Sequence, residues 1–400
     1  LPFLRTVIPV NANVAVAYDW RGAVNLGGAE ARDPDSPYDN GATRGTFTWD
    51  WREESGDWRF FFVDAASVDS PMRWLMRTTW TDPAAGSSDI DTRMYGPASD
   101  PFTAAGEEGD DMVDPDWYGP HTLELVGRSP YLVMAGTVWP FDTSSGRNED
   151  WVSAPASEGL HELLLHNVLY AGSDFELPFG TEVGSVQLST DELRLVGDTC
   201  GSLVLTSTPP LPEPKVTPYG PAAPTFSTDD TAVADNPHDP PRATFRHRLE
   251  LAGEAGQFVV SLVGEADDDL DLYLLFDADG DGELSFDEER IGESAGVTAE
   301  ERIELPGVAR AGTYEIWVHG YLVEGADSVF DLRIDVVSGE DLIVGDPPQG
   351  IEAGQAAALR VCVDVSGLAP SATEASGLLF AGPSAAPRLI GLPVAWQREP

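Results

Sequence analysis

Apolar and polar residues alternate along most of this 400-residue chain. The alternation comes in short runs that are bounded by clusters of Gly, Pro, Asp and Asn, and helical periodicity is scarce. A period of two is typical of β-strands, and regular turns between short strands are typical of β-sandwiches. The pattern therefore predicts an all-β chain, with strands at Trp58 to Val63, Trp74 to Trp80, Tyr131 to Trp139, Leu160 to Tyr170, Phe258 to Val263, Leu270 to Phe276, Tyr314 to Val318 and Phe330 to Val336.

Two parts of the chain carry the same residues at the same spacing, which indicates an internal duplication. Gly159 to His166 and Gly312 to His319 each begin with Gly, have Glu at the fourth position and end with His. Both are preceded by a strand that starts with Asp-x-Asp, at Asp89 to Asp91 and at Asp269 to Asp271. We expect two related sandwiches in tandem, of jelly-roll or immunoglobulin-like type.

The repeat and the proline content predict five segments. Residues 207–242 are rich in proline, which excludes a helix or a central strand, so we expect an extended connector there. Leu1 to Tyr18 contains one alternating strand with no hairpin partner beside it. The predicted order is an N-terminal extended segment with a possible donor strand (1–44), a first β-sandwich (45–206), the connector (207–242), a second β-sandwich (243–338) and a small immunoglobulin- or fibronectin-like β module (339–400).

An acidic loop follows the strand that ends at Phe276. Residues 277 to 288 read Asp-Ala-Asp-Gly-Asp-Gly-Glu-Leu-Ser-Phe-Asp-Glu. Calcium needs six to eight oxygen ligands, and a twelve-residue loop supplies them from positions 1, 3, 5, 7, 9 and 12, with Gly at position 6. The predicted cofactor is Ca²⁺, and its predicted ligands are Asp277, Asp279, Asp281, the carbonyl of Glu283, Ser285 through water, and Glu288, with Gly282 at the turn.

The alternative for this loop is a solvated acidic turn without a metal. Because a strand and not a helix leads into it, we expect a structural ion and not a signalling one. Four further acids precede the loop and are candidates for a second ion, namely Asp267, Asp268, Asp269 and Asp271. Asp89 and Asp91 hold the matching place in the first part of the chain, but no acidic loop follows them there, so we expect no metal.

The formal charge of −45 restricts the partners and the environment. Such a chain repels nucleic acids and anionic membranes, and no apolar run approaches the roughly 18 residues of a membrane helix. The acidity suits a calcium-containing exterior, so we expect a secreted or cell-surface protein. Cys200 and Cys362 are the only cysteines, which excludes a disulfide framework but leaves one long-range disulfide open.

The sequence predicts no catalytic activity. No serine lies in a nucleophile-elbow context, and the sequence contains no phosphate-binding glycine loop and no zinc motif. We expect His166 and His319, which end strands in the two repeats, each to form a hydrogen bond with an adjacent loop. A cluster of aromatic residues is expected to fill a sandwich core and, as the alternative, to line a sugar-binding face; it comprises Trp49, Trp51, Trp58, Phe60, Phe61, Phe62, Trp74 and Trp80.

Several of these stretches resemble a known family. The segments from Trp58-Arg-Phe-Phe-Phe to His166-Asn-Val-Leu-Tyr look like the region that follows the catalytic domain in large secreted subtilisin-like serine peptidases. Asp269-Leu-Asp-Leu-Tyr, with Gly312-Thr-Tyr-Glu-Ile-Trp-Val-His, is similar to bacterial pre-peptidase C-terminal domains. The resemblance covers residues 45 to 340. The family's catalytic motifs, His-Gly-Thr and Gly-Thr-Ser-Met-Ala, are absent, so the resemblance implies an accessory β-sandwich region.

These observations give three hypotheses for function. The first is a processed, calcium-stabilised and non-catalytic region of a secreted subtilisin-like peptidase, which attaches to a cell-surface or polymer ligand or serves assembly. The second is an extracellular filament subunit that self-associates by adding the strand at Leu1 to Tyr18 to its neighbour's sheet. The third and weaker hypothesis is a carbohydrate-binding module that uses the tryptophans.

Overall fold

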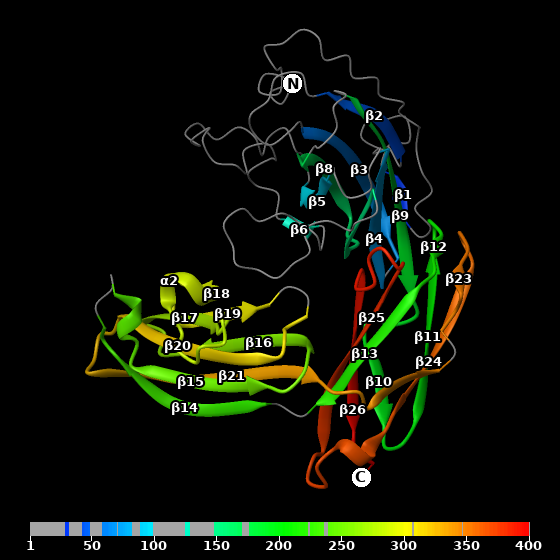
Figure 1. Cartoon of the computed structure of the whole chain (residues 1–400). Coiled ribbons are helices and arrows are strands. Elements are labelled where there is room, and N and C mark those ends of the chain that lie inside the picture. The colour runs from blue at the N-terminus through cyan, green and yellow to red at the C-terminus, as the bar shows by residue number, and fades with distance from the viewer. Residues whose placement is uncertain are drawn as a thin grey trace.

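The structure of the protein is a computed structural model that describes residues 29–31, 42–48, 58–69, 71–81, 89–98, 125–128, 148–169, 176–222, 225–235, 239–305, 308–345 and 347–399. These residues are almost entirely β, as the alternating pattern predicted (Figure 1). None of their helices is long and apolar enough to cross a membrane. The strand predicted at Tyr131 to Trp139 lies outside the described residues.

Within the described residues, the first repeat has eight main strands and the second repeat has eight. The first repeat contains β2 (Ala42–Thr48), β3 (Trp58–Val68), β4 (Met72–Trp80), β5 (Asp89–Ala98), β6 (Leu125–Arg128), β7 (Glu149–Pro155), β8 (Gly159–Leu169) and β9 (Glu176–Leu188), with the short β1 (Ala29–Ala31) beside β3. The second repeat contains β14 (Phe226–Val233), β15 (Phe245–Leu251), β16 (Ala255–Val263), β17 (Asp269–Phe276), β18 (Arg290–Ser294), β19 (Glu300–Glu304), β20 (Gly312–Leu322) and β21 (Asp327–Ser338).

The two repeats have the same topology, strand for strand. In the first, β2-β9-β4-β7 and β3-β8-β5-β6 are hydrogen-bonded neighbours, and in the second the orders are β14-β21-β16-β19 and β15-β20-β17-β18. Asp91 is paired with His166 in the first repeat, as Asp271 is with His319 in the second. The register also shifts at the same place, directly after Asp89 and Asp269. The predicted duplication is therefore confirmed at the level of the backbone.

A third sandwich is built from strands on both sides of the second repeat. Its sheets are β22-β24-β11, which continues into β9 of the first repeat, and β10-β26-β25-β13. We call it the C-terminal sandwich. It contains β10 (Leu193–Val196), β11 (Cys200–Ser207), β12 (Leu211–Pro212), β13 (Lys215–Ala222), β22 (Leu342–Gly345), β23 (Gly350–Ile351), β24 (Ala356–Val363), β25 (Glu374–Gly382) and β26 (Ile390–Gln397), and the short 3₁₀ helix Val365–Gly367.

This arrangement divides the chain differently from the sequence prediction. Residues 339–400 do not stand alone as a module, because β24 pairs with β11 and β25 pairs with β13. Residues 207–242 are more than a connector, since they supply β13 and β14. Both strands are at sheet edges, where a proline such as Pro218 removes no hydrogen bond from an inner ladder. The second repeat is an insertion between β13 and β22.

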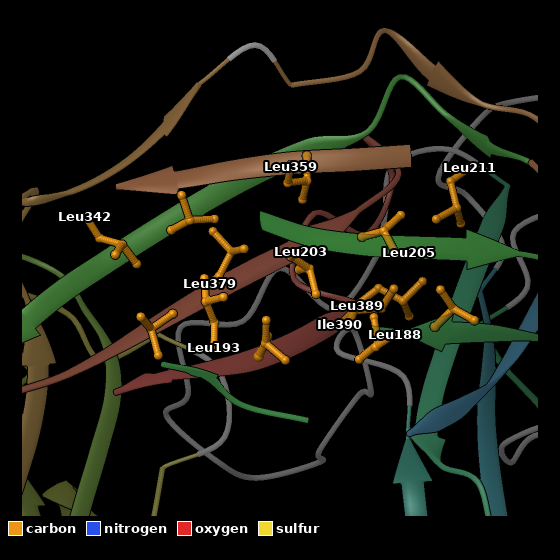
Figure 2. Close-up of a cluster of buried hydrophobic side chains, with 14 of the residues drawn as sticks. Leu188, Leu193, Leu203, Leu205, Leu211, Leu342, Leu359, Leu379, Leu389 and Ile390 are labelled. Carbon is orange, nitrogen blue, oxygen red and sulfur yellow. The ribbon is translucent and has the colours of Figure 1, made fainter. Parts of the chain in front are cut away.

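The C-terminal sandwich has one continuous hydrophobic core. Figure 2 shows Leu203 and Leu205 of β11 together with Leu379 and Ile390, which come from the opposite sheet. Leu188 of the first repeat joins the same core, so the two sandwiches share buried surface.

Cys200 and Cys362 form the disulfide that the sequence left open. They lie directly opposite each other on β11 and β24, with their Cα atoms 4.0 Å apart. The bond spans 162 residues of sequence and closes the chain around the inserted second repeat.

Strand β17 is buried on both faces and leads into the acidic loop. Leu270, Leu272 and Leu274 point into the core between the two sheets of the second repeat. Tyr273 and Leu275 point to the outer face, where Trp317 of β20 joins them. The apolar side chains on this outer face are shielded from water by Leu284 and Phe286, which follow the strand.

Candidate metal centre

Three carboxylates of the acidic loop converge. Asp277, Asp279 and Asp281 each place one oxygen within 4.8 Å of the others, and no other group of acids, histidines or cysteines does so among the residues that the structure describes. They are positions 1, 3 and 5 of the predicted loop. Oxygen atoms this close repel one another unless a cation or a proton lies between them, so the arrangement suits a hard cation.

Backbone hydrogen bonds hold Asp277 at the centre of the turn. Its Oδ1 accepts a hydrogen bond from the backbone N–H of Gly280 at 2.7 Å, and its Oδ2 accepts one from Gly282 at 3.0 Å. Both glycines have positive φ, 76° and 84°, a region that L side chains rarely adopt. The sharp turn that the sequence predicted at Gly282 is confirmed.

The next two acids repeat the same kind of contact. Asp279 accepts from the N–H of Asp281 at 3.1 Å, and Asp281 accepts from the N–H of Glu283 at 2.8 Å. Each carboxylate is thereby fixed by the backbone two residues further on, an Asx-turn that orients its oxygen. A cation would find these three ligands already oriented.

The acid that closes the loop is Glu289, one residue after the predicted ligand. Glu289 is 8% exposed and accepts from the N–H groups of Ala278 at 2.9 Å and Ser285 at 2.7 Å. It belongs to the single-turn helix α2 (Phe286–Glu289), which places Glu288 on the solvent side. The converging group includes neither Glu288 nor the exposed Glu283 and Ser285, so their roles as ligands stay predictions.

Residues after the carboxylates anchor the loop to the outer face of the sheet. Leu284 and Phe286 pack against the group of Tyr273, Leu275 and Trp317. The Phe286 ring stacks on Trp317 at a centroid distance of 5.5 Å and meets Tyr273 edge-on at 5.0 Å. Because these contacts cover apolar surface, a change in the loop affects the packing of the sheet beneath it.

The acids before the loop form a second, buried group. Asp271 is 4% exposed, and its Oδ2 accepts from the Tyr273 hydroxyl at 2.9 Å and lies 3.1 Å from Nδ1 of His319. His319 is fully buried, and its predicted hydrogen bond is made to the neighbouring strand instead of a loop. Burial and the adjacent Asp271 carboxylate raise the pKa of Tyr273. The side chains of Asp89, Asp91 and His166 lie outside the described residues.

The remaining acids in this region differ in exposure and contacts. Asp267 is exposed, whereas Asp268 is buried and accepts from the N–H of Glu324 at 2.9 Å. Asp269 is buried, and its pKa is raised by burial first and then by the charges of Asp271 and Glu301. Sequence reasoning missed Glu301, because it comes from β19 in the opposite sheet and no local pattern marks it.

Two of the predicted aromatic residues are part of the core. Trp74 and Trp80 are 1% and 7% exposed and pack inside the first repeat, which removes them from any sugar-binding face. The side chains of the other cluster members, Trp49, Trp51, Trp58, Phe60, Phe61 and Phe62, lie outside the described residues. So does the predicted donor strand at Leu1 to Tyr18.

No family model and no curated protein matches this chain. A crystal structure of tripeptidyl peptidase 2 is similar at 10% identity with a TM-score of 0.32, covering 89% of this chain and 30% of that one. A putative secreted protein from Eubacterium rectale is similar at 10% identity with a TM-score of 0.18, covering 76% of this chain and 75% of that one. The chain thus spans less than a third of the peptidase, and neither similarity assigns it to a family.

Proposed function

We propose that this chain is a calcium-stabilised, extracellular and non-catalytic β-sandwich region. The observation that carries the proposal is the convergence of Asp277, Asp279 and Asp281 within 4.8 Å on a loop whose glycines are already in the required turn. Calcium accepts carboxylate, carbonyl and water oxygens in a flexible geometry, whereas magnesium demands a near-ideal octahedron. An exposed loop with three fixed carboxylates and access for water suits calcium better.

The ion's role in this proposal is structural. The loop lies between β17 and a helix of one turn, and the described residues offer no second helix that could swing open as in a calcium sensor. Phe286, at the end of the loop, packs on Trp317 instead. Binding would neutralise the carboxylates and so favour the loop conformation that covers the outer face of the sheet.

The proposed location outside the cell is supported by chemistry. A disulfide such as Cys200–Cys362 persists in oxidising compartments and is rare in the cytosol. Millimolar calcium, typical of the same environment, is sufficient for a weak loop of the extracellular kind. A net charge of −45 keeps such a protein dispersed by self-repulsion.

The biological role that we propose is that of an accessory region of a secreted subtilisin-like peptidase, which attaches the enzyme to a surface or polymer or serves its assembly. Two observations support this role. Residues 45 to 340 resemble the regions that follow the catalytic domain in such peptidases, and the catalytic motifs of that family are absent from the sequence. The gene provides a test. A subtilisin domain encoded upstream of Leu1 is the expected result, and an unrelated upstream reading frame would contradict this part of the proposal.

Calorimetric titration of Ca²⁺ into the chelator-treated full chain tests the metal proposal. We expect binding with a dissociation constant of about 10⁻⁴ to 10⁻³ M, the range of extracellular loops. Replacing Asp277→Asn together with Asp281→Asn should abolish this binding event. The matched control is Asp287→Asn, an exposed acid of the same segment that lies outside the converging group. Unchanged heats in the double variant would overturn the proposal.

A further inference from the structure

The Cys200–Cys362 disulfide lies on the outer face of its sheet. On β11 and β24 the residues with odd numbers, such as Leu203 and Val361, point into the core of the C-terminal sandwich, so both cysteines point away from that core. Figure 1 shows the two strands next to each other, on the side of this sandwich that faces away from the second repeat. Cys200 is exposed and Cys362 is half-buried. The bond is therefore at the surface of the molecule.

An arginine side chain lies against one of the two sulfur atoms. Nη2 of Arg360, on β24, is 3.4 Å from Sγ of Cys200. In the described part of the chain, this sulfur is the only hydrogen-bonding partner of the Arg360 side chain. The exposed Arg194 of the same sandwich pairs instead with a carboxylate two residues away, Glu192. A guanidinium group beside a cysteine stabilises its thiolate, so Arg360 favours negative charge on Cys200.

The two sulfur atoms are therefore unequal in thiol–disulfide exchange. A thiolate that attacks one sulfur of a disulfide expels the other as a thiolate, and the exchange is faster when the expelled sulfur is the better leaving group. Because Arg360 lies against Cys200, the better leaving group is Cys200. Attack at Cys362 is favoured.

The two strands are held together by more than this bond. β11 and β24 pair through seven residues each, from Cys200 opposite Cys362 to Thr206 opposite Ala356. The inward-facing leucines of both strands belong to the continuous core of the C-terminal sandwich. Since opening the disulfide leaves this ladder and this core in place, exchange can occur in the folded chain.

We propose that the Cys200–Cys362 bond is a site of reversible covalent modification by a small thiol. The small thiolate attacks Sγ of Cys362 and forms a new S–S bond there, while the bond to Cys200 breaks and its electron pair leaves on Sγ of Cys200. One disulfide replaces another, so the step needs no further oxidant or reductant. In the reverse step the Cys200 thiolate attacks Cys362 and expels the small thiolate. This inference is independent of the proposed calcium loop.

The surroundings of Cys362 favour a small thiol over a cysteine of another protein. Cys362 is half-buried and lies between Cys200 and Ile343, its neighbour on the edge strand β22. A thiolate that displaces Cys200 approaches Cys362 from the opposite side, which is the side of β22. Ile343 is 50% exposed there. Its side chain leaves a small molecule access to the sulfur and hinders a folded partner.

The position and rate of modification in the full chain test the proposal. The chain is incubated with glutathione, quenched with excess N-ethylmaleimide and digested, and mass spectrometry locates both groups on its only two cysteines. We expect glutathione on Cys362 and maleimide on Cys200, at a rate that rises linearly with glutathione concentration. A rate that becomes independent of concentration would show that unfolding limits the reaction, and glutathione mainly on Cys200 would show the opposite leaving group. Either result would overturn the proposal.

Arg360→Gln tests the role of the arginine. It should slow modification about three- to tenfold, because the expelled thiolate loses its positive neighbour. Arg194→Gln removes an exposed positive charge from the same sandwich and is the matched control, so it should react like the unmodified chain. Circular dichroism verifies that both variants are folded. An unchanged rate in Arg360→Gln would contradict the assignment of Cys200 as the leaving group.

A comparison of thiols tests the preference for a small molecule. A folded protein with one exposed cysteine should react about tenfold more slowly per thiolate than glutathione, because its access to Cys362 is restricted. Ile343→Ala should reduce this difference. Equal rates for the two thiols in the unmodified chain would show that the site accepts protein thiols, and the assignment to a small thiol would be wrong.

Discussion

Glu289 joins the two ends of the Asp277 loop, because one of its oxygens accepts from Ala278 and the other from Ser285. We expect Glu289→Ala to lower the free energy of unfolding by about 1–3 kcal/mol, since it removes two hydrogen bonds between backbone N–H groups and a buried carboxylate. The exposed neighbour Glu288→Ala should change it by less than about 0.5 kcal/mol. Urea unfolding in the presence of chelator measures both. Equal losses in the two variants would contradict the assignment of Glu289.

Asp269 gives the metal-free protein a pH dependence of definite sign. Its pKa in the folded state is raised, so its contribution to stability is greatest below its unfolded pKa, about 3.9, and is lost as the pH rises through the folded value. Asp269→Asn should therefore be more stable than the unmodified chain at pH 7 in chelator, with the advantage shrinking towards pH 4. Urea unfolding across this range would contradict the account if the variant were less stable at pH 7.

At the scale of elements, the disulfide joins two neighbouring strands that are far apart in sequence. Replacing both Cys200 and Cys362 with Ser removes the constraint on a loop of 162 residues in the unfolded state. We expect a loss of about 2–5 kcal/mol in the C-terminal sandwich. Thermal unfolding with and without reductant measures it. A reductant effect that persists in the double variant would show that the loss has another cause.

Local sequence predicted the strands well and their partners poorly. The alternation over Trp74 to Trp80 and Leu270 to Phe276 marks strands because successive side chains of a strand point to opposite faces of the sheet. Strand β13 was missed because its prolines disfavour strands in general and are tolerated at an edge. The pairing of β11 with β24 across the insertion leaves no local signal, so the prediction treated 339–400 as independent.

In the candidate site, too, the residues with a local sequence pattern were predictable and those placed by long-range packing were not. Asp277, Asp279 and Asp281 were predictable because a calcium loop is a contiguous pattern. Glu289 was not, since the fixed spacing of helix-loop-helix proteins points to Glu288. The influence of Glu301 on the pKa of Asp269 was not predictable either, because the two residues belong to different sheets.

For the whole molecule, the structure predicts which fragments fold. Residues 225–338 contain both sheets of the second repeat and should fold alone with the calcium response intact. Residues 339–400 should not, because β24 would lack β11 and β25 would lack β13. Circular dichroism and cooperative thermal unfolding of the two fragments measure this. A stable monomeric fold of 339–400 would contradict the discontinuous sandwich.

The two sandwiches joined at the insertion are in close contact. Gly256 of the second repeat lies against Tyr219 of β13, where an added Cβ would be 2.5 Å from the ring. The backbone N–H of Gly220 also donates to the carbonyl of Gly339 at 3.0 Å. We therefore expect stabilisation of the second repeat to stabilise the C-terminal sandwich as well.

Calorimetric scans of the full chain, with millimolar calcium and with chelator, test the central claim most directly. Calcium should stabilise the second repeat by on the order of 1 kcal/mol and raise its melting temperature by a few degrees. In Asp277→Asn with Asp281→Asn this shift should disappear, whereas Asp287→Asn should retain it. Identical scans with calcium and with chelator in the unmodified chain would contradict the account.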